Sequence, residues 1–310
     1  MHAVAPECQT TPSISPHDMR EVDKVMLDVI DRSEDSRAHS IMVSSANRAA
    51  IYHLKSGGQR IRARLALHSA RCLNLTKKDG IVLAATAELI HNASLIHDDL
   101  QDRDEIRRNV AAVWFVHGDD IAICAGDLLL SAAYSTIADV SCTDKLPRLI
   151  NLVHSRGVRA ISGQCADLSC ASAESLDVDE YLKITTAKSG SLLGLPMELA
   201  LLAADCSSAL DATRSTVNSF AAGYQIFDDL CDLEADLARG VAAPALNVVQ
   251  VLQRNNAMTS HQAWESAKKL GLKHLQVAAT DSADLPLQSG RLLQKLAMDL
   301  MAQLKGKCIQ

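Results

Sequence analysis

The stretch LIHDDLQD, residues 95–102, has a near copy far along the chain, QIFDDLCD at residues 225–232. Each copy places the pattern DDLxD directly after an apolar helical turn. Residues i and i+4 lie on one face of a helix, so Asp98 and Asp102 point the same way, as do Asp228 and Asp232. Carboxylates that share a face repel each other, and burial at the end of an apolar helix raises this cost. The repeat therefore predicts a positively charged ligand at each helix end.

Magnesium is the cation that suits this pattern best. It prefers carboxylate oxygens, keeps several waters and is often completed by substrate phosphates. Two such helices facing each other across a bundle would hold a Mg²⁺–diphosphate group between them. Two alternatives to a magnesium site are less consistent with the sequence. A solvated acidic face would be favoured if DDxxD occurred only once. A structural Ca²⁺ loop would need a D-x-D-x-D-G pattern, which the sequence lacks. The predicted metal ligands are Asp98, Asp99, Asp102, Asp228, Asp229 and Asp232.

The composition indicates an all-α protein. Of 310 residues, 48% are apolar and 22% charged, as in globular proteins, while aromatic residues make up only 3% and there are 14 Gly and 7 Pro. A β-sandwich or barrel needs more turns and more aromatic residues. Helical periodicity predicts helices over 18–31, 41–54, 79–103, 119–138, 145–170, 177–204 and 208–237. The helix at 79–103 is apolar nearly all round, so we expect it to be central and buried.

We expect a single domain over residues 18–310, because no linker rich in Pro, Gly or Ser follows residue 60. Residues 1–17 carry three prolines among Ser and Thr and read as a disordered tail.

The net charge, the apolar runs and the cysteines limit which partners and which cellular compartment are expected. The net charge of −6 argues against a nucleic-acid binder that relies on a positive field. No apolar run approaches the ~20 residues that span a bilayer, so no membrane span is expected. The first residues lack a basic start and an apolar core, so they do not resemble a signal peptide. Nine cysteines without CxxC spacing favour reduced thiols and a cytoplasmic location.

Cationic side chains lie where a metal–phosphate site would need them. Arg107 and Arg108 closely follow the first acidic motif, and Arg62 follows a Gly-Gly turn. Lys188 lies in ITTAKSGSLLG, where β-branched residues, glycine and a following proline predict an irregular helix. His91 precedes Asp98 by two turns on the same stripe. Arg and Lys are the usual phosphate contacts, so these residues are candidates for diphosphate binding.

In these motifs the chain resembles the trans-isoprenyl diphosphate synthase (polyprenyl synthetase) family, from about residue 50 to 250. The resemblance implies an all-α isoprenoid-synthase helical bundle around a central cavity, a homodimer and three Mg²⁺ ions at two diphosphate sites. The substrates implied are isopentenyl diphosphate and an allylic diphosphate, joined head to tail.

The resemblance also implies a role for each matching residue. Asp98, Asp102 and Asp228 would be the main metal ligands, with Asp99, Asp229 and Asp232 in support. The allylic diphosphate would be held by Arg107 and Lys188, with Ser189 beside them, and Tyr224 and Gln225 would line the allylic pocket. Isopentenyl diphosphate would be held by Arg62, His91 and Arg108, with Gln59 nearby. The residues taken as catalytic are Asp98, Asp99, Asp102, Lys188, Asp228 and Asp229.

The sequence departs from the family pattern at three places. Gln59 stands where the family has a lysine that contacts isopentenyl diphosphate, and Asn109 stands where a glycine usually ends the Arg-Arg pair. After Asp232 the usual lysine-bearing loop is short, and Arg239 is the only cation nearby.

Product length should depend on the residues beneath the first acidic motif. Ala93 and Ser94 lie one turn before Asp98, and Ile90 lies a further turn away. In the family, aromatic residues near these positions stop the chain early, so small residues predict geranylgeranyl diphosphate or a longer product. The alternatives are a terpene cyclase of the same fold and a non-catalytic subunit of a prenyl synthase. The intact second motif argues against the first, and both intact motifs argue against the second.

Overall fold

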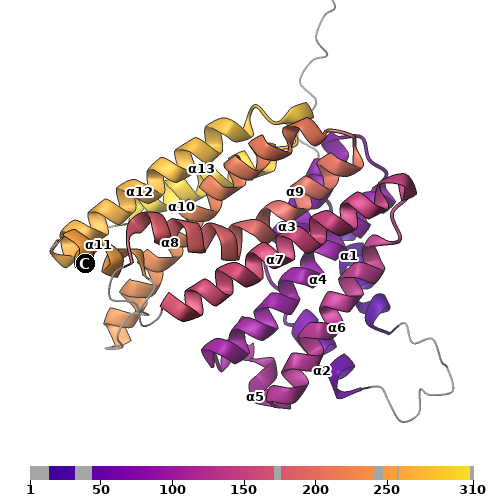
Figure 1. The fold of residues 1–310 in the computed structure, drawn as a ribbon, viewed down its shortest axis with the longest axis horizontal. Coiled ribbons are helices and arrows are strands. Elements are labelled where there is room, and N and C mark those ends of the chain that lie inside the picture. Colours follow the sequence, from indigo (N-terminus) through magenta and orange to yellow (C-terminus); the bar gives the residue numbers. More distant parts are fainter. Residues whose placement is uncertain (1–13, 32–43, 171–175, 240–246, 257, 308–310) are drawn as a thin grey trace, which may run out of the picture. The chain divides into compact units, whose positions relative to one another are not determined.

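The computed structural model describes residues 14–31, 44–170, 176–239, 247–256 and 258–307. Almost all of this chain is helical, which confirms the all-α prediction (Figure 1). It divides into two compact units, residues 1–150 with 199–205 and residues 151–198 with 206–310. The prediction of a single domain stays a prediction. Most of the expected tail lies outside the described residues, and the first helix already begins at Pro16.

The first unit, in indigo to magenta in Figure 1, surrounds one long helix. That helix, α4 (Lys77–Asp102), packs against α1 (Pro16–Ile30), α3 (Ile61–Cys72) and α6 (Asp119–Ile137). The hydroxyl of Thr76 caps its N-terminus by accepting from the backbone N–H of Asp79. Most of its residues are buried, as the apolar pattern at 79–103 predicts. The remaining helices of the unit are α2 (Ser45–Lys55) and α5 (Val113–His117).

The second unit is built from the helices that follow, in red to yellow in Figure 1. The long helix α10 (Leu210–Arg239) packs against α12 (Ser260–Ser282), and α12 packs against α13 (Arg291–Gly306). The other helices are α7 (Leu146–Cys170), α8 (Val178–Thr185), α9 (Ser191–Ala203) and α11 (Val248–Asn256). The first turn of α7 and the last turn of α9 belong to the first unit. The predicted irregularity near Lys188 is a π-helix over Thr186–Gly190, which separates α8 from α9.

One feature of α6 differs from expectation. By length and composition it could cross a membrane, although no such segment was predicted. Core helices of globular proteins pass the same test, and α6 packs against α4.

Candidate active site

The first acidic motif forms the C-terminal turn of α4, where its three carboxylates differ in exposure. Asp99 is turned inward, with a side chain only 1% exposed, and it accepts a hydrogen bond from Arg107 Nε at 2.7 Å and another from the Nη2 of the same guanidinium. Burial raises the pKa of the Asp99 carboxyl, and Arg107 opposes this rise. Asp98 is half-buried and Asp102 is exposed. The outer pair is therefore placed for a ligand, while Asp99 ties the helix end to the segment that follows.

That segment is a small β-hairpin, which helical periodicity did not predict. Strand β1 (Ile106–Arg107) pairs with β2 (Val110–Ala111), and the two turn residues have positive φ, 53° at Arg108 and 62° at Asn109. Two-residue hairpins of this kind favour residues that tolerate the left-handed region, and asparagine does so. Asn109 can therefore replace the family's glycine without loss of the turn.

The hairpin directs Arg108 toward a glycine turn. Its Nη1 donates to the carbonyl of Gly57 and, at 3.4 Å, to Asn92 Oδ1. A Cβ on Gly58, whose φ is 123°, would lie 2.7 Å from Arg108 Cζ. Glycine is required at that position because any side chain would both strain the backbone and displace the guanidinium.

The structure brings together the three residues expected to hold isopentenyl diphosphate. Burial holds the pKa of His91 well below its usual value, and the charges of Arg62 and Arg108 lower it further. His53, which contacts Asn92 Oδ1 at 3.1 Å, lies close enough to add to this effect. A neutral imidazole among guanidinium groups makes an electropositive site that suits a diphosphate. Gln59 is exposed nearby on the chain.

Two charged residues near this group have a structural role that the sequence did not reveal. Arg60 donates to the carbonyl of Leu54 at 3.0 Å, and its guanidinium lies 3.0 Å from Asp23 and 3.6 Å from Glu88. Glu88 is buried and accepts from the backbone N–H of Ala63 at 3.0 Å. These contacts hold the start of α3, from which Arg62 projects.

The second acidic motif, on α10, repeats the pattern of the first. Asp229 is buried and accepts hydrogen bonds from Val248 N at 2.7 Å, Tyr181 Oη at 2.8 Å and Gln225 Nε2 at 3.0 Å. Burial raises the pKa of Asp229 to about 6, although these donors lower it. Asn247 Nδ2 donates to the Asp229 carbonyl at 3.0 Å. Asp229 thus joins α8, α10 and α11, and Gln225 is engaged with it.

The outer carboxylates of this motif act on each other. Burial raises the pKa of Asp228 to about 6, and the negative charge of Asp232, one turn later, adds to the rise. A divalent cation would relieve this repulsion, and paired carboxylates are the ligands that Mg²⁺ prefers. The donor set of the motif therefore fits the predicted metal.

Lys188 lies in the π-helix and forms an ion pair with Asp167 of α7. A Cβ on Gly163 would lie 2.3 Å from the backbone nitrogen of Lys188, so this glycine permits the close approach of α7. Asp167 was not predicted. Its spacing of four residues from Gly163 places both on one helix face, but this spacing does not identify Lys188 as the partner.

The remaining predicted residues, those of the allylic pocket and of product length, all lie on helices. Ser189 is half-buried in the π-helix, and the ring of Tyr224 stacks on Phe220 with centroids 6.3 Å apart. Ile90 and Ala93 are buried on α4, and Ser94 Oγ donates to the carbonyl of His91 at 2.8 Å. Their role in product length stays a prediction.

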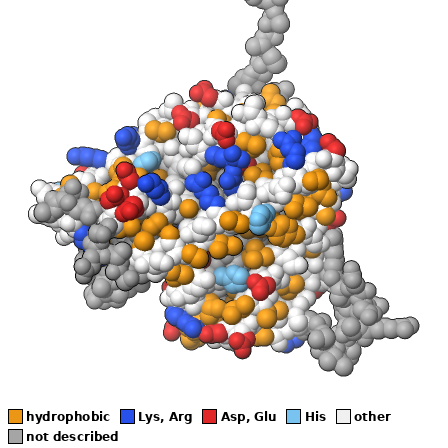
Figure 2. All heavy atoms as spheres, viewed as in Figure 1, with side chains coloured by type: hydrophobic (Ala, Val, Ile, Leu, Met, Phe, Trp, Pro, Cys, Tyr) orange, Lys and Arg blue, Asp and Glu red, His pale blue; other side chains and the backbone are white. Residues whose placement is uncertain are grey.

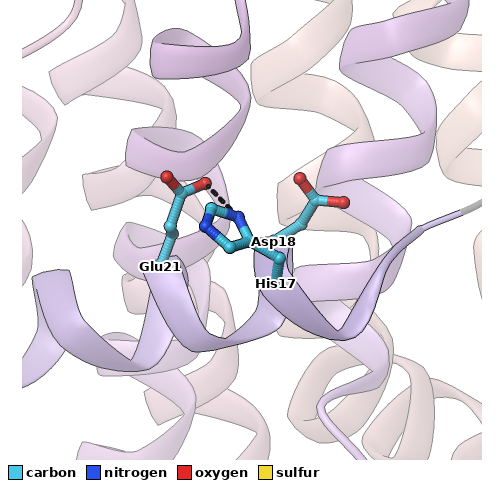
Figure 3. Close-up of side chains that lie close together, drawn as sticks. All are labelled: His17, Asp18 and Glu21. Atoms are coloured by element: carbon cyan, nitrogen blue, oxygen red, sulfur yellow. Dashed lines mark ion pairs between the residues drawn. The ribbon is translucent and has the colours of Figure 1, made fainter.

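A further cluster of possible metal ligands lies on α1, where His17, Asp18 and Glu21 approach one another (Figure 3). Cations of the protein already occupy it. Arg71 lies 2.6 Å from Asp18, and Lys77 lies 2.5 Å from Glu21. Burial acts to raise the pKa of Asp18, but hydrogen bonds from Ser15 and Arg71 hold it below its ordinary value. The cluster is therefore an ion-pair network at the helix start.

Among the described cysteines, seven are free thiols, in line with the reduced state expected from their spacing.

Comparison with known proteins gives the same family as the motifs. The polyprenyl synthetase family matches residues 43–240, more than half of the chain. The chain is 33% identical over 204 residues to geranylfarnesyl diphosphate synthase of Aeropyrum pernix, covering 64% of each protein. It is 32% identical over 202 residues to farnesyl diphosphate synthase of Bacillus subtilis, covering 62% of this chain and 68% of the relative. The matched part spans under two thirds of the Aeropyrum pernix protein.

Solved structures support the fold. The geranylgeranyl pyrophosphate synthetase of Geoglobus acetivorans superposes with a TM-score of 0.77 at 24% identity, over 92% of this chain and 98% of that one. A decaprenyl diphosphate synthase of Rhodobacter capsulatus superposes with a TM-score of 0.72 at 19% identity, over 93% and 96%. These structures share the fold, and the match of the family model over residues 43–240 shows that the chain belongs to the polyprenyl synthetase family.

Proposed function

We propose that the protein is a trans-prenyltransferase that condenses isopentenyl diphosphate with an allylic diphosphate to give geranylgeranyl diphosphate or a longer product. The observation that carries this proposal is the shared design of the two acidic motifs. In each, the middle carboxylate, Asp99 or Asp229, is buried and bonded to protein donors. The outer carboxylates are more exposed and have i and i+4 spacing, which suits a cation–diphosphate ligand.

Asp98, Asp102 and Asp228 would hold Mg²⁺ directly, with Asp232 close by and three ions in all. When bound, the metal ions stabilise the negative charge that develops on the departing diphosphate. Asp99 and Asp229 support the ligands from inside, because their own oxygens accept from Arg107 and from Val248, Tyr181 and Gln225.

The cationic residues bind and orient the two substrates. Arg107 and Lys188 hold the allylic diphosphate, with Ser189 beside them, and Arg62, His91 and Arg108 hold isopentenyl diphosphate. The allylic C–O bond breaks, the isopentenyl double bond forms the new C–C bond, and a proton then leaves the product for the released diphosphate. Apolar side chains around the chain pocket exclude water, which would otherwise quench the carbocation.

Product length is the finer part of the proposal. The relatives named above are farnesyl and geranylfarnesyl diphosphate synthases, so family membership alone leaves the length open. The small side chains of Ala93 and Ser94, with Ile90 one turn deeper, favour a product longer than fifteen carbons.

We further propose that the enzyme is a cytoplasmic homodimer. Support for a second copy comes from exposed apolar side chains in the first unit, on α5 and the start of α6: Phe115, Val116 and Ile123. Large apolar side chains that are exposed in one subunit are the kind that a subunit interface would bury.

One observation favours a second candidate, a non-catalytic subunit of another prenyl synthase. Gln59, in place of the family's lysine, removes one positive charge from the isopentenyl diphosphate group. A terpene cyclase is disfavoured by the DDLCD form of the second motif.

The test is an incorporation assay with purified protein, Mg²⁺, isopentenyl diphosphate and dimethylallyl, geranyl or farnesyl diphosphate. Products are sized by carbon number. Turnover that EDTA abolishes and Mg²⁺ restores supports the synthase. A folded protein that gives no product with any primer supports the subunit, and a cyclic hydrocarbon would support the cyclase.

A further inference from the structure

A small hollow in the second unit is lined by side chains of α7, α9 and α10. It is narrow: the space that it encloses is about 20 Å³, room for about one water-sized atom, and its mouth opens to solvent. Its charged lining residues are Arg156, Arg159, Glu198 and Arg214, none of which is assigned to the active site. Lys and Arg side chains gather near the middle of the face that Figure 2 shows. An oxyanion would therefore place one oxygen in the hollow and keep its other oxygens at the mouth.

The single carboxylate of the hollow is fully engaged. Glu198 is 2% exposed, and its Oε1 accepts from Arg156 Nε at 2.7 Å. Its Oε2 accepts from Arg156 Nη2 and from Arg214 Nε, both at 2.7 Å. Glu198 therefore holds two guanidinium groups in fixed positions at the edge of the hollow.

The lining carries more positive than negative charge. Arg159 adds a third guanidinium, so two positive charges are left without a lining carboxylate. Arg214 Nη1 also reaches Asp211 at 2.8 Å, but that carboxylate is almost fully exposed and solvent screens the pair. Guanidinium groups held together at a partly buried position favour an anion that would offset their repulsion.

A buried hydroxyl group also points to a ligand. Ser191 lines the hollow, is 5% exposed, and its Oγ has no hydrogen-bond partner among the described residues. A helical serine normally donates to the carbonyl four residues earlier, but Ser191 directly follows the π-helix, whose hydrogen bonds are displaced by one residue. A buried hydroxyl without a partner is costly, and an anion's oxygen would satisfy it.

Two glycines keep the hollow open. A Cβ on Gly194 would lie 3.4 Å from Glu198 Oε1, and a Cβ on Gly190 would lie 3.1 Å from Asn218 Oδ1. Both side chains would narrow the space beside the carboxylate and the serine.

From these contacts we propose that the hollow binds a phosphate-like dianion. The guanidinium groups of Arg156, Arg159 and Arg214 neutralise its charge, and the hydroxyl of Ser191 donates to one of its oxygens. The ligand is inorganic phosphate, diphosphate, or the terminal phosphate of a larger molecule whose remainder stays outside. This site is separate from the one proposed for catalysis, and its existence does not depend on that function.

The experiment is isothermal titration of the full chain with inorganic phosphate, in EDTA and at constant ionic strength. Arg159→Gln changes an exposed side chain and leaves the fold intact, and it should weaken phosphate binding about tenfold or more. Two variants serve as controls: the first should bind as the wild type does, and the second should lose only phosphate bound at the proposed substrate site and keep the binding that Arg159→Gln weakens. Arg148→Gln makes the same change at an exposed position of α7 outside the hollow, and Arg62→Gln makes it in the proposed substrate site.

The variant Ser191→Ala distinguishes an effect on phosphate binding from an effect on the stability of the fold. It should leave the free energy of unfolding of the ligand-free protein unchanged or higher, because it removes an unsatisfied hydroxyl, while phosphate affinity falls. Parallel titrations with diphosphate and glycerol phosphate distinguish the sources of the phosphate group. The proposal is overturned if Arg159→Gln and Ser191→Ala bind phosphate as tightly as the wild type, if phosphate does not bind at all, or if binding is lost only in Arg62→Gln.

Discussion

The guanidinium of Arg107 holds the carboxylate of Asp99 from the hairpin that follows α4, with Nε 2.7 Å from Oδ1. In the second motif, Tyr181, Gln225 and the backbone of Val248 hold Asp229 in the same way. Each DDLxD motif thus contains one inward carboxylate that fixes the helix end and an outer pair of carboxylates at i and i+4 spacing, which we propose as metal ligands. Substitutions of neighbouring aspartates should therefore have different effects on stability and turnover.

Asp99→Asn should mainly cost stability, whereas Asp98→Asn should mainly cost turnover. The first change weakens a pair with a 1% exposed carboxylate and leaves Arg107 poorly compensated. Because Arg107 is itself partly exposed, we expect a loss of about 1–3 kcal/mol in the free energy of unfolding. The second change removes a charge that is only half-buried, so it should cost less stability than the first. Urea unfolding and kcat for both variants check this, and equal destabilisation by the two changes would contradict it.

Gly163→Ala should lower activity, and Gly157→Ala on the same helix should not. A Cβ at position 163 would lie 2.3 Å from the backbone nitrogen of Lys188, whereas a Cβ at position 157 meets no atom within 4 Å. Displacing Lys188 should lower kcat on the order of 10- to 100-fold. At position 157, helix propensity predicts a gain in stability of roughly 0.5–1 kcal/mol. Wild-type turnover in a folded Gly163→Ala variant would show that Lys188 tolerates the shift.

Several elements around these residues could be predicted from the sequence alone, and others could not. The apolar run at 79–103 predicts α4 almost to the residue, because it is long and its periodicity is strong. The β-branched residues and glycine around Lys188 predict an irregular helix, found as a π-helix. The hairpin that carries Arg107 and Arg108 has strands of only two residues. Such strands are too short to show an alternating pattern, so the hairpin could not be predicted from the sequence.

Helical spacing also predicts which aspartates share a face, but it leaves their partners unknown. Asp99 is held by a residue eight positions away, and Asp229 by Val248, 19 positions away. Such contacts depend on how the chain folds back, which a one-dimensional pattern does not encode. The pairing of Lys188 with Asp167 was missed for the same reason.

His53 should lower the stability of the folded protein as the pH drops below about 6.5, whereas Asp228 and Asp229, whose pKa values are raised to about 6, act in the opposite direction. Burial, with Arg108 adding to it, lowers the pKa of His53 to about 3 in the folded protein. Between pH 6.5 and 3 the unfolded chain therefore binds a proton that the folded protein does not, so this histidine favours folding above pH 6.5 and loses that contribution below it.

For one such group the slope is about 1.4 kcal/mol per pH unit. Denaturant unfolding of His53→Gln between pH 7 and 5 should show a shallower decline than the wild type. His154→Gln, at an exposed position, is the control and should follow the wild-type curve. Parallel curves for the wild type and His53→Gln would mean that His53 is protonated in the folded protein.

Ala93→Phe should shorten the product. Ala93 is fully buried one turn before the acidic end of α4. In the proposed function this position limits the length of the growing chain, so an aromatic ring there would stop it earlier. Overpacking can cost 1–3 kcal/mol, roughly, so Ser94→Phe at a half-buried position is a second variant that keeps the test valid. Product sizing by mass spectrometry reads the outcome. If both variants are folded and active and make the wild-type length, the assignment of these residues to chain length is wrong.

The central claim, that two motifs 130 residues apart serve one reaction, is tested most directly by the kcat of Asp98→Asn, Asp228→Asn and the double variant, with Mg²⁺, isopentenyl diphosphate and farnesyl diphosphate. Each single variant should lose turnover on the order of 10²-fold, since each removes a ligand that stabilises the same leaving group. The double variant should be scarcely slower than the slower single variant, because residues that act as a unit are non-additive. Wild-type turnover in either single variant, or losses that multiply as for independent sites, would contradict the account.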